Sequence, residues 1–114
     1  MTPTAVPSLE LYQAEWCPFS HRVRLRLTEL GVDVILRQVA ADRKERVAMA
    51  EATGGVVGIP TLITPDGAVS GVDEIIAWLD ARYRERPDVE RQRAKRRADW
   101  PIWVDLHGPG GPLA

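Results

Sequence analysis

Cys17-Pro18-Phe19-Ser20 is the most informative segment of this chain. It holds the only cysteine, which follows a short strand pattern at residues 9–12 and precedes an amphipathic helical pattern. Proline is well tolerated in a first helical turn, so Pro18 favours a helix that begins directly after Cys17. Unpaired backbone N–H groups and the positive end of the helix dipole then favour the Cys17 thiolate, the reactive form of cysteine.

Length and composition indicate one small globular domain of 114 residues. Fifteen Lys and Arg side chains nearly balance sixteen Asp and Glu side chains, so the formal net charge is −1. We therefore expect no attraction to nucleic acid or to an anionic membrane. No apolar run approaches the ~18 residues of a membrane span, and residues 1–8 lack the pattern of a secretory signal. A single cysteine allows no intramolecular disulfide, which favours a reducing, cytoplasmic location.

Apolar periodicity predicts the first half of the fold as strand, helix, strand and helix. The first helical stripe has spacings of four, four and three and ends before Gly31; its members are Phe19, Val23, Leu27 and Leu30. Residues 32–39 predict a second, largely buried strand. Asp42 is expected to cap a helix over residues 43–52, which Gly54-Gly55 ends.

The second half of the sequence predicts a β-hairpin and a third helix. A Pro-Asp-Gly turn separates two apolar runs at residues 61–63 and 68–70. The third helix is marked by Ile75, Ile76, Leu79 and Tyr83, and it is expected to stop near Pro87. The predicted order is therefore β-α-β-α-β-β-α, with the first two strands parallel and the last two antiparallel.

Three segments at matching spacing resemble the glutaredoxins and the N-terminal domain of cysteine-type glutathione transferases. They are Trp16–Leu25, Ile59–Leu62 and Val72–Leu79. The resemblance implies a thioredoxin-like (glutaredoxin) α/β fold with a mixed four-stranded sheet over residues 8–84. Residues 85–114 are then a C-terminal extension, expected to be helical and then disordered.

The resemblance also implies a binding site for glutathione or another low-molecular-weight thiol. In the family a cis proline faces the cysteine, which here implies a cis Pro60 and places the backbone of Ile59 against the cysteinyl part of the thiol. An acidic residue at the start of the third helix implies that Val72 and Asp73 receive the γ-glutamyl end. The alternatives are a trans loop proline at position 60 and an Asp73 that only caps or charges the helix.

The chain also departs from the family pattern. Glutathione transferases have an acid and a serine where this chain has Gly71 and Val72. Glutaredoxins have a lysine shortly before the cysteine, whereas this chain has Glu15 in that stretch, which would raise the pKa of the thiol if it lay close. These differences keep open a thiol other than glutathione.

A monothiol mechanism is expected because Ser20 stands where dithiol glutaredoxins have a second cysteine. Cys17 would take the small thiol from a mixed disulfide with a target protein, and a second small thiol would regenerate it. Ser20 is either a donor to the sulfur or only a residue of the first helical turn. The residues expected to contact the small thiol are Trp16, Pro18, Phe19, Ser20, Ile59, Pro60, Val72 and Asp73.

Two other functions stay open beside this one. The first is a non-catalytic module that docks a thiol ligand or a protein, with Cys17 as an inert core residue. The second is an iron–sulfur carrier dimer, although such family members usually have glycine where this chain has Pro18. His21 and His107 form no zinc spacing with one cysteine, so no metal site is expected.

The expected partners are a small thiol and disulfide-bearing proteins, bound by a monomer or a weak homodimer. In the extension, a basic run at residues 91–97 precedes Trp100 and Trp103. Nearby acids almost balance the run, so we interpret this part as a helix that covers apolar surface or meets another subunit rather than as a contact for RNA or lipid.

Overall fold

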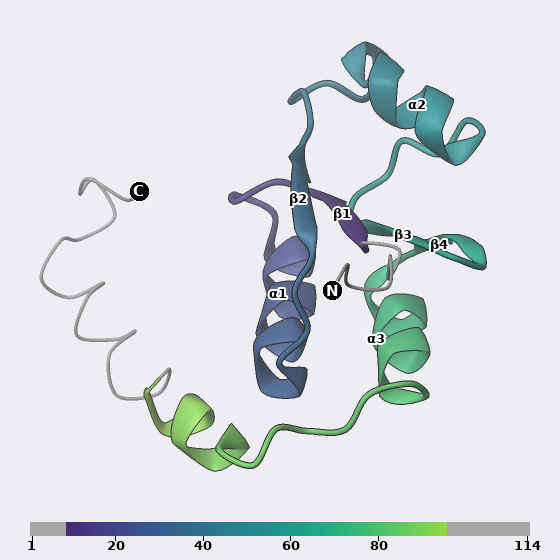
Figure 1. The fold of residues 1–114 in the computed structure, drawn as a ribbon. Helices are drawn as coiled ribbons and strands as arrows, with labels where there is room; N and C mark the ends of the chain where they lie inside the picture. The colour runs from purple at the N-terminus through teal and green to yellow at the C-terminus, as the bar shows by residue number, and fades with distance from the viewer. Residues whose placement is uncertain (1–8, 96–114) are drawn as a thin grey trace, which may run out of the picture.

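The computed structural model of the chain describes residues 9–95. Their element order is β1 (Glu10–Gln13), α1 (Pro18–Leu30), β2 (Ile35–Gln38), the 3-10 helix η1 (Arg43–Glu45), α2 (Val47–Thr53), β3 (Thr61–Thr64), β4 (Gly67–Ser70) and α3 (Val72–Asp80) (Figure 1). Apart from the extra 3-10 helix, this is the predicted order. Within residues 9–95 no helix is long and apolar enough to cross a membrane.

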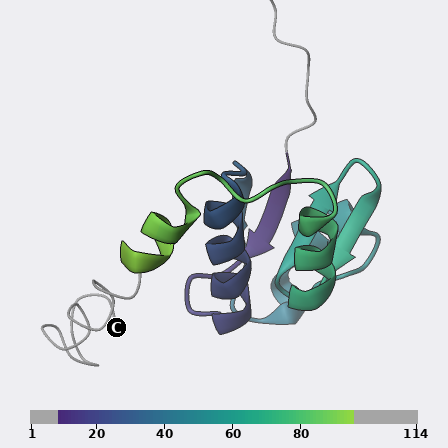
Figure 2. The ribbon, with the colours of Figure 1, turned by 90° about the horizontal axis from the view of Figure 1, so that it is seen from below.

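The four strands form one mixed sheet in the order β2-β1-β3-β4. Strand β1 pairs parallel with β2 and antiparallel with β3, and β3 pairs antiparallel with β4. The predicted directions of the strands are therefore confirmed. Helices α1 and α3 lie side by side against the sheet, whereas α2 stands apart from them (Figures 1 and 2).

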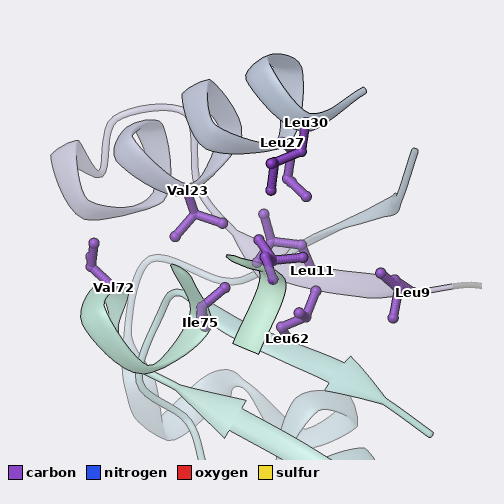
Figure 3. Packing of buried hydrophobic residues seen from close by; sticks show 9 residues of the cluster. Leu9, Leu11, Val23, Leu27, Leu30, Leu62, Val72 and Ile75 are labelled. Atoms are coloured by element: carbon purple, nitrogen blue, oxygen red, sulfur yellow. The ribbon is translucent and has the colours of Figure 1, made fainter. Parts of the chain in front are cut away.

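The hydrophobic core lies between the sheet and the pair α1 and α3 (Figure 3). Each burial of an aliphatic side chain of this size contributes about 1.5–3 kcal/mol relative to exposure. The cluster consists of Leu9, Leu11, Val23, Leu27, Leu30, Leu62, Val72, Ile75 and Leu79. This packing fixes the start of α1 relative to the start of α3, where the predicted site residues lie.

Helix α1 begins and ends where the sequence predicts. Pro18 is its first residue, and Gly31 ends it in the left-handed conformation with φ of 67°. The buried stripe, however, begins with Ser20 and not with Phe19, which is 56% exposed. Positions three and four before Val23 both neighbour its face of the helix, and here the former turns inward.

Two expectations for the middle of the chain are wrong. Strand β2 covers residues 35–38 rather than 32–39, and all four of its residues are exposed because it is an edge strand with a single neighbour. The helix expected over residues 43–52 is broken into η1 and α2, since Arg46 between them has a non-helical ψ of 55°. Asp42 makes no side-chain capping hydrogen bond, but Gly54 ends α2 as predicted.

Helix α3 ends at Asp80, earlier than the sequence predicts. Tyr83 therefore lies outside the helix and is exposed. The chain then passes over the far end of α1, where the Arg86 N–H donates to the Glu29 carbonyl at 2.9 Å. Residues 89–95 are helical. The rest of the predicted extension, including Trp100 and Trp103, lies outside the described residues.

Candidate functional site

Cys17 is the N-cap residue of α1, as the sequence predicts. Its backbone is extended, with φ of −87° and ψ of 116°, and its Sγ accepts the backbone N–H of Ser20 at 3.4 Å. An N-cap side chain normally uses an oxygen to satisfy one of the free donors of the first turn. Here the sulfur takes that position, so a negative charge on it meets the donors directly.

The surroundings of Cys17 lower the pKa of its thiol. Burial acts in the opposite direction, because the residue is only 5% exposed. Hydrogen bonds from the Ser20 hydroxyl and from the backbone N–H groups of Ser20 and Phe19, together with the charge of Arg24, outweigh that burial. The net effect favours the thiolate.

Arg24 is held near the thiol by a buried amide. Its guanidinium donates to Oε1 of Gln13, which is almost fully buried, while Nε2 of Gln13 donates to Oε1 of Gln38 at 3.1 Å. The same guanidinium contacts the carboxylate of Glu15 at 2.9 Å. Glu15 is thus paired with a cation.

The Ile59–Pro60 peptide bond is cis, as the resemblance implies. Four carbonyl groups around it accept hydrogen bonds: Val56 from Thr53, Val57 from Arg46, Gly58 from Thr61 and Pro60 from Gly71. The backbone of Ile59 makes no hydrogen bond within residues 9–95. Hydrogen bonds therefore hold the loop on both sides of Ile59, while the backbone N–H and C=O of Ile59 itself are available to a partner.

A groove of about 330 Å³ lies between the start of α1, the cis-proline loop and the start of α3. Its lining residues are Phe19, Arg22, Ile59, Pro60, Gly71, Val72, Asp73 and Glu74. Five of the predicted thiol-binding residues meet there. Trp16, Cys17, Pro18 and Ser20 do not line it. Cys17 precedes the lining residue Phe19 by two positions in the sequence and is buried, whereas Trp16 is 65% exposed.

Sequence reasoning missed Glu74. The N-cap of α3 is Gly71, which has φ of 93° and supplies no side-chain cap. Oε2 of Glu74 lies only 2.7 Å from the position that a Cβ at residue 71 would take, so its carboxylate lies over the bare glycine. The signal in the sequence was a second acid directly after Asp73, following a helix cap with no side chain.

The charges in the groove suit a small organic ligand with charged ends. Arg22 offers a guanidinium, and Asp73 and Glu74 offer carboxylates, around the apolar surface of Ile59, Pro60 and Val72. Such a set matches a molecule that carries both an ammonium and a carboxylate group. Within residues 9–95 no group of three or more His, Cys, Asp or Glu side chains could hold a metal ion.

Residues 11–87 match the family described as "Glutathione S-transferase, N-terminal domain". A probable glutaredoxin from Synechocystis is 32% identical over 79 residues, which cover 69% of this chain and 72% of that protein.

Solved structures of both kinds share the fold. A rice glutathione transferase in complex with glutathione has a TM-score of 0.57 at 23% identity, covering 86% of this chain and 45% of that one. Glutaredoxin from Brucella melitensis has a TM-score of 0.52 at 22% identity, covering 71% of this chain and 87% of that one. The chain spans about half the length of the glutathione transferases that it matches.

Proposed function

Because the chain belongs to the glutathione S-transferase N-terminal domain family and is related to a probable glutaredoxin, we propose that it is a monothiol thiol–disulfide oxidoreductase. It reduces mixed disulfides of proteins with glutathione or a similar low-molecular-weight thiol. The observation that carries the proposal is the sulfur of Cys17 as the N-cap of α1, with its pKa lowered by hydrogen bonds from the first turn.

The chemistry uses one sulfur. The Cys17 thiolate attacks the small-thiol sulfur of a mixed disulfide, a new disulfide forms to Cys17, and the target leaves as a thiolate that takes a proton from water. A second small thiol, as its thiolate, then attacks that disulfide. It forms the oxidised small-thiol dimer and releases Cys17 as the thiolate. In the net reaction one free small thiol is consumed: the mixed disulfide and that thiol become the reduced target and the oxidised small-thiol dimer.

The groove supplies the binding. The open backbone groups of Ile59 pair with the cysteinyl part of the thiol, beside the apolar ring of Pro60. Asp73 and the first N–H groups of α3, including that of Val72, receive the ammonium and carboxylate of the γ-glutamyl end. Phe19 forms the apolar wall next to the reacting sulfur, and Ser20 keeps that sulfur ionised.

Turnover of a glutathionylated cysteine peptide in the presence of glutathione tests this function. Wild-type protein is expected to exceed the background rate clearly, and Cys17→Ser is expected to lose at least a hundredfold of that activity. Thr28→Ala, an exposed change on the same helix, serves as the control and is expected to keep it. If wild type and Cys17→Ser are equally slow, the oxidoreductase proposal is wrong.

The burial of Cys17 favours one second candidate, a module that binds a thiol ligand or a protein without turnover. Such a module needs the groove but no accessible sulfur. It predicts slow alkylation of Cys17 at pH 7 together with measurable binding of S-methylglutathione, a ligand that cannot react. Rapid alkylation at that pH would exclude it.

A further inference from the structure

Arg46 is a buried cation that pairs with no carboxylate within residues 9–95. The residue is only 6% exposed, and no Asp or Glu lies within ion-pair distance of its guanidinium. Burying a charge without compensation is costly. Here the compensation comes from three backbone carbonyl oxygens: Ala40 at 2.8 Å, Ala41 at 3.1 Å and Val57 at 2.7 Å.

These three bonds join two segments that are distant in sequence. Nε and Nη2 donate to the segment that follows β2, while Nη1 donates to Val57, 11 residues further along the chain from Arg46. The guanidinium group presents its donors in a rigid planar fork, which lysine lacks. Arg46 itself is fixed by its backbone, since its carbonyl accepts the Ala50 N–H at 3.0 Å at the start of α2.

Val57 lies two residues before Ile59, so this bond bears on the groove. The hydrogen bonds from Thr53 and Thr61 to the same loop are local, each spanning three residues. The bonds that reach the loop from a distance are Arg46 to Val57 on one side of Ile59 and Gly71 to Pro60 on the other. Ile59 therefore lies between two hydrogen bonds that tie its loop to distant parts of the chain.

We propose that Arg46 is a positioning residue that holds the cis-proline loop in its ligand-binding conformation. It does not touch the ligand. It fixes the carbonyl group of Val57. The backbone N–H and C=O of Ile59 are thereby kept directed to the groove, and they make no hydrogen bond within residues 9–95. This inference rests on the proposed role of the groove as the thiol-binding site. Arg46 itself is not among the residues that line the groove.

Arg46→Lys and Arg46→Met test this role, with Arg43→Met as the matched control. Arg43 lies close to the same loop, with Nη2 3.8 Å from the Cβ position of Gly58, but makes no side-chain hydrogen bond to it. The readouts are the Kd for S-methylglutathione, the backbone order parameters of residues 57–59, and the rate of Cys17 alkylation by iodoacetamide. Both Arg46 variants are expected to raise the Kd about tenfold, the equivalent of about one lost hydrogen bond to the ligand.

The order parameters should fall from about 0.85 towards 0.6 or below in both Arg46 variants, while the alkylation rate stays as in the wild type. Arg43→Met should change none of these values. An unchanged Kd and an unchanged loop in Arg46→Lys overturn the inference, and so does loss of the folded state in both variants. If the wild type binds S-methylglutathione but turns over no mixed disulfide, the proposed function fails and the role of Arg46 stands.

Discussion

Helices α1 and α3 both begin at the candidate site, but their first turns are built in opposite ways. Helix α1 is capped by the sulfur of Cys17 and has no acidic residue in its first turn. Helix α3 is capped by Gly71 without any side-chain bond, and it has Asp73 and Glu74 in its first turn. At α1 the negative charge is therefore on the cap residue before the helix. At α3 it is on two residues of the first helical turn.

The difference shows how the same helix dipole serves two purposes. At α1 an acid in the first turn would repel a thiolate, and its absence leaves the donors and the dipole to act on Cys17. At α3 the dipole is matched by carboxylates that face the groove, where their oxygens can also accept a ligand's ammonium group. The start of α1 thus favours an anion of the protein, whereas the acids at the start of α3 offer a site for a cation of the ligand.

The largest expected effect concerns the sulfur itself. Since the pKa of Cys17 is lowered in the folded state, the ionised thiol stabilises the fold. That contribution is fully present above the ordinary thiol pKa of about 8.5 and is lost as the pH falls through the folded pKa. The unfolding free energy of the wild type, relative to Cys17→Ser, should therefore rise with pH over that window, by at most 1.36 kcal/mol per pH unit.

Urea unfolding of both proteins between about pH 6 and pH 9 measures this difference. Every other titrating group is common to the two proteins, so the difference between their unfolding free energies reports the contribution of the thiol. A difference that is flat with pH would mean that the α1 start does not favour the anion, and the contrast between the two helices would disappear.

Much of the fold could be predicted from local sequence. Pro18 and Gly31 mark the ends of α1 because proline suits a first turn and glycine suits a left-handed cap. The hairpin follows from its Pro-Asp-Gly turn. The exposure of β2 could not be predicted, because β-branched composition indicates a strand but not whether it lies at the edge of a sheet. The break at Arg46 could not be predicted, since the carbonyl partners of its side chain lie in two separate segments, at residues 40–41 and at Val57.

The candidate site likewise has some features that the sequence could predict and others that it could not. Cys17 was predictable from its neighbours in sequence, whereas the cis bond at Pro60 was expected only from the resemblance. The position of Glu74 over Gly71 depends on a side-chain conformation that no spacing rule specifies. The pairing of Glu15 with Arg24 likewise depends on the buried Gln13, which fixes the guanidinium.

A second prediction sharpens the comparison at α1. Ser20→Ala removes the hydroxyl that donates to the Cys17 sulfur while it leaves the backbone cap in place. A hydrogen bond to a charged group contributes about 1.5–3 kcal/mol, so alkylation of Cys17 at pH 6 should slow about tenfold or more. The rates of variant and wild type should converge at high pH, where both thiols are ionised.

Ser70→Ala serves as the control for that experiment, because the Ser70 hydroxyl bonds to Thr61 and not to the thiol. Its alkylation rate should match the wild type at every pH. A Ser20→Ala profile that coincides with the wild-type profile would leave the backbone N–H groups and Arg24 as the only causes of the lowered pKa.

The smallest expected effect belongs to the start of α3. Asp73→Asn and Glu74→Gln each remove one carboxylate from the groove and keep its shape. Since an exposed ion pair contributes about 0.2–1 kcal/mol, each should raise the Kd for S-methylglutathione by no more than about fivefold. The effect should shrink at high salt, and Cys17 alkylation should not change, because the groups that lower the pKa of the thiol belong to Ser20, Phe19 and Arg24. If Glu74→Gln alone leaves the Kd unchanged at low salt, its carboxylate only complements the helix dipole and Asp73 alone receives the ligand's ammonium group.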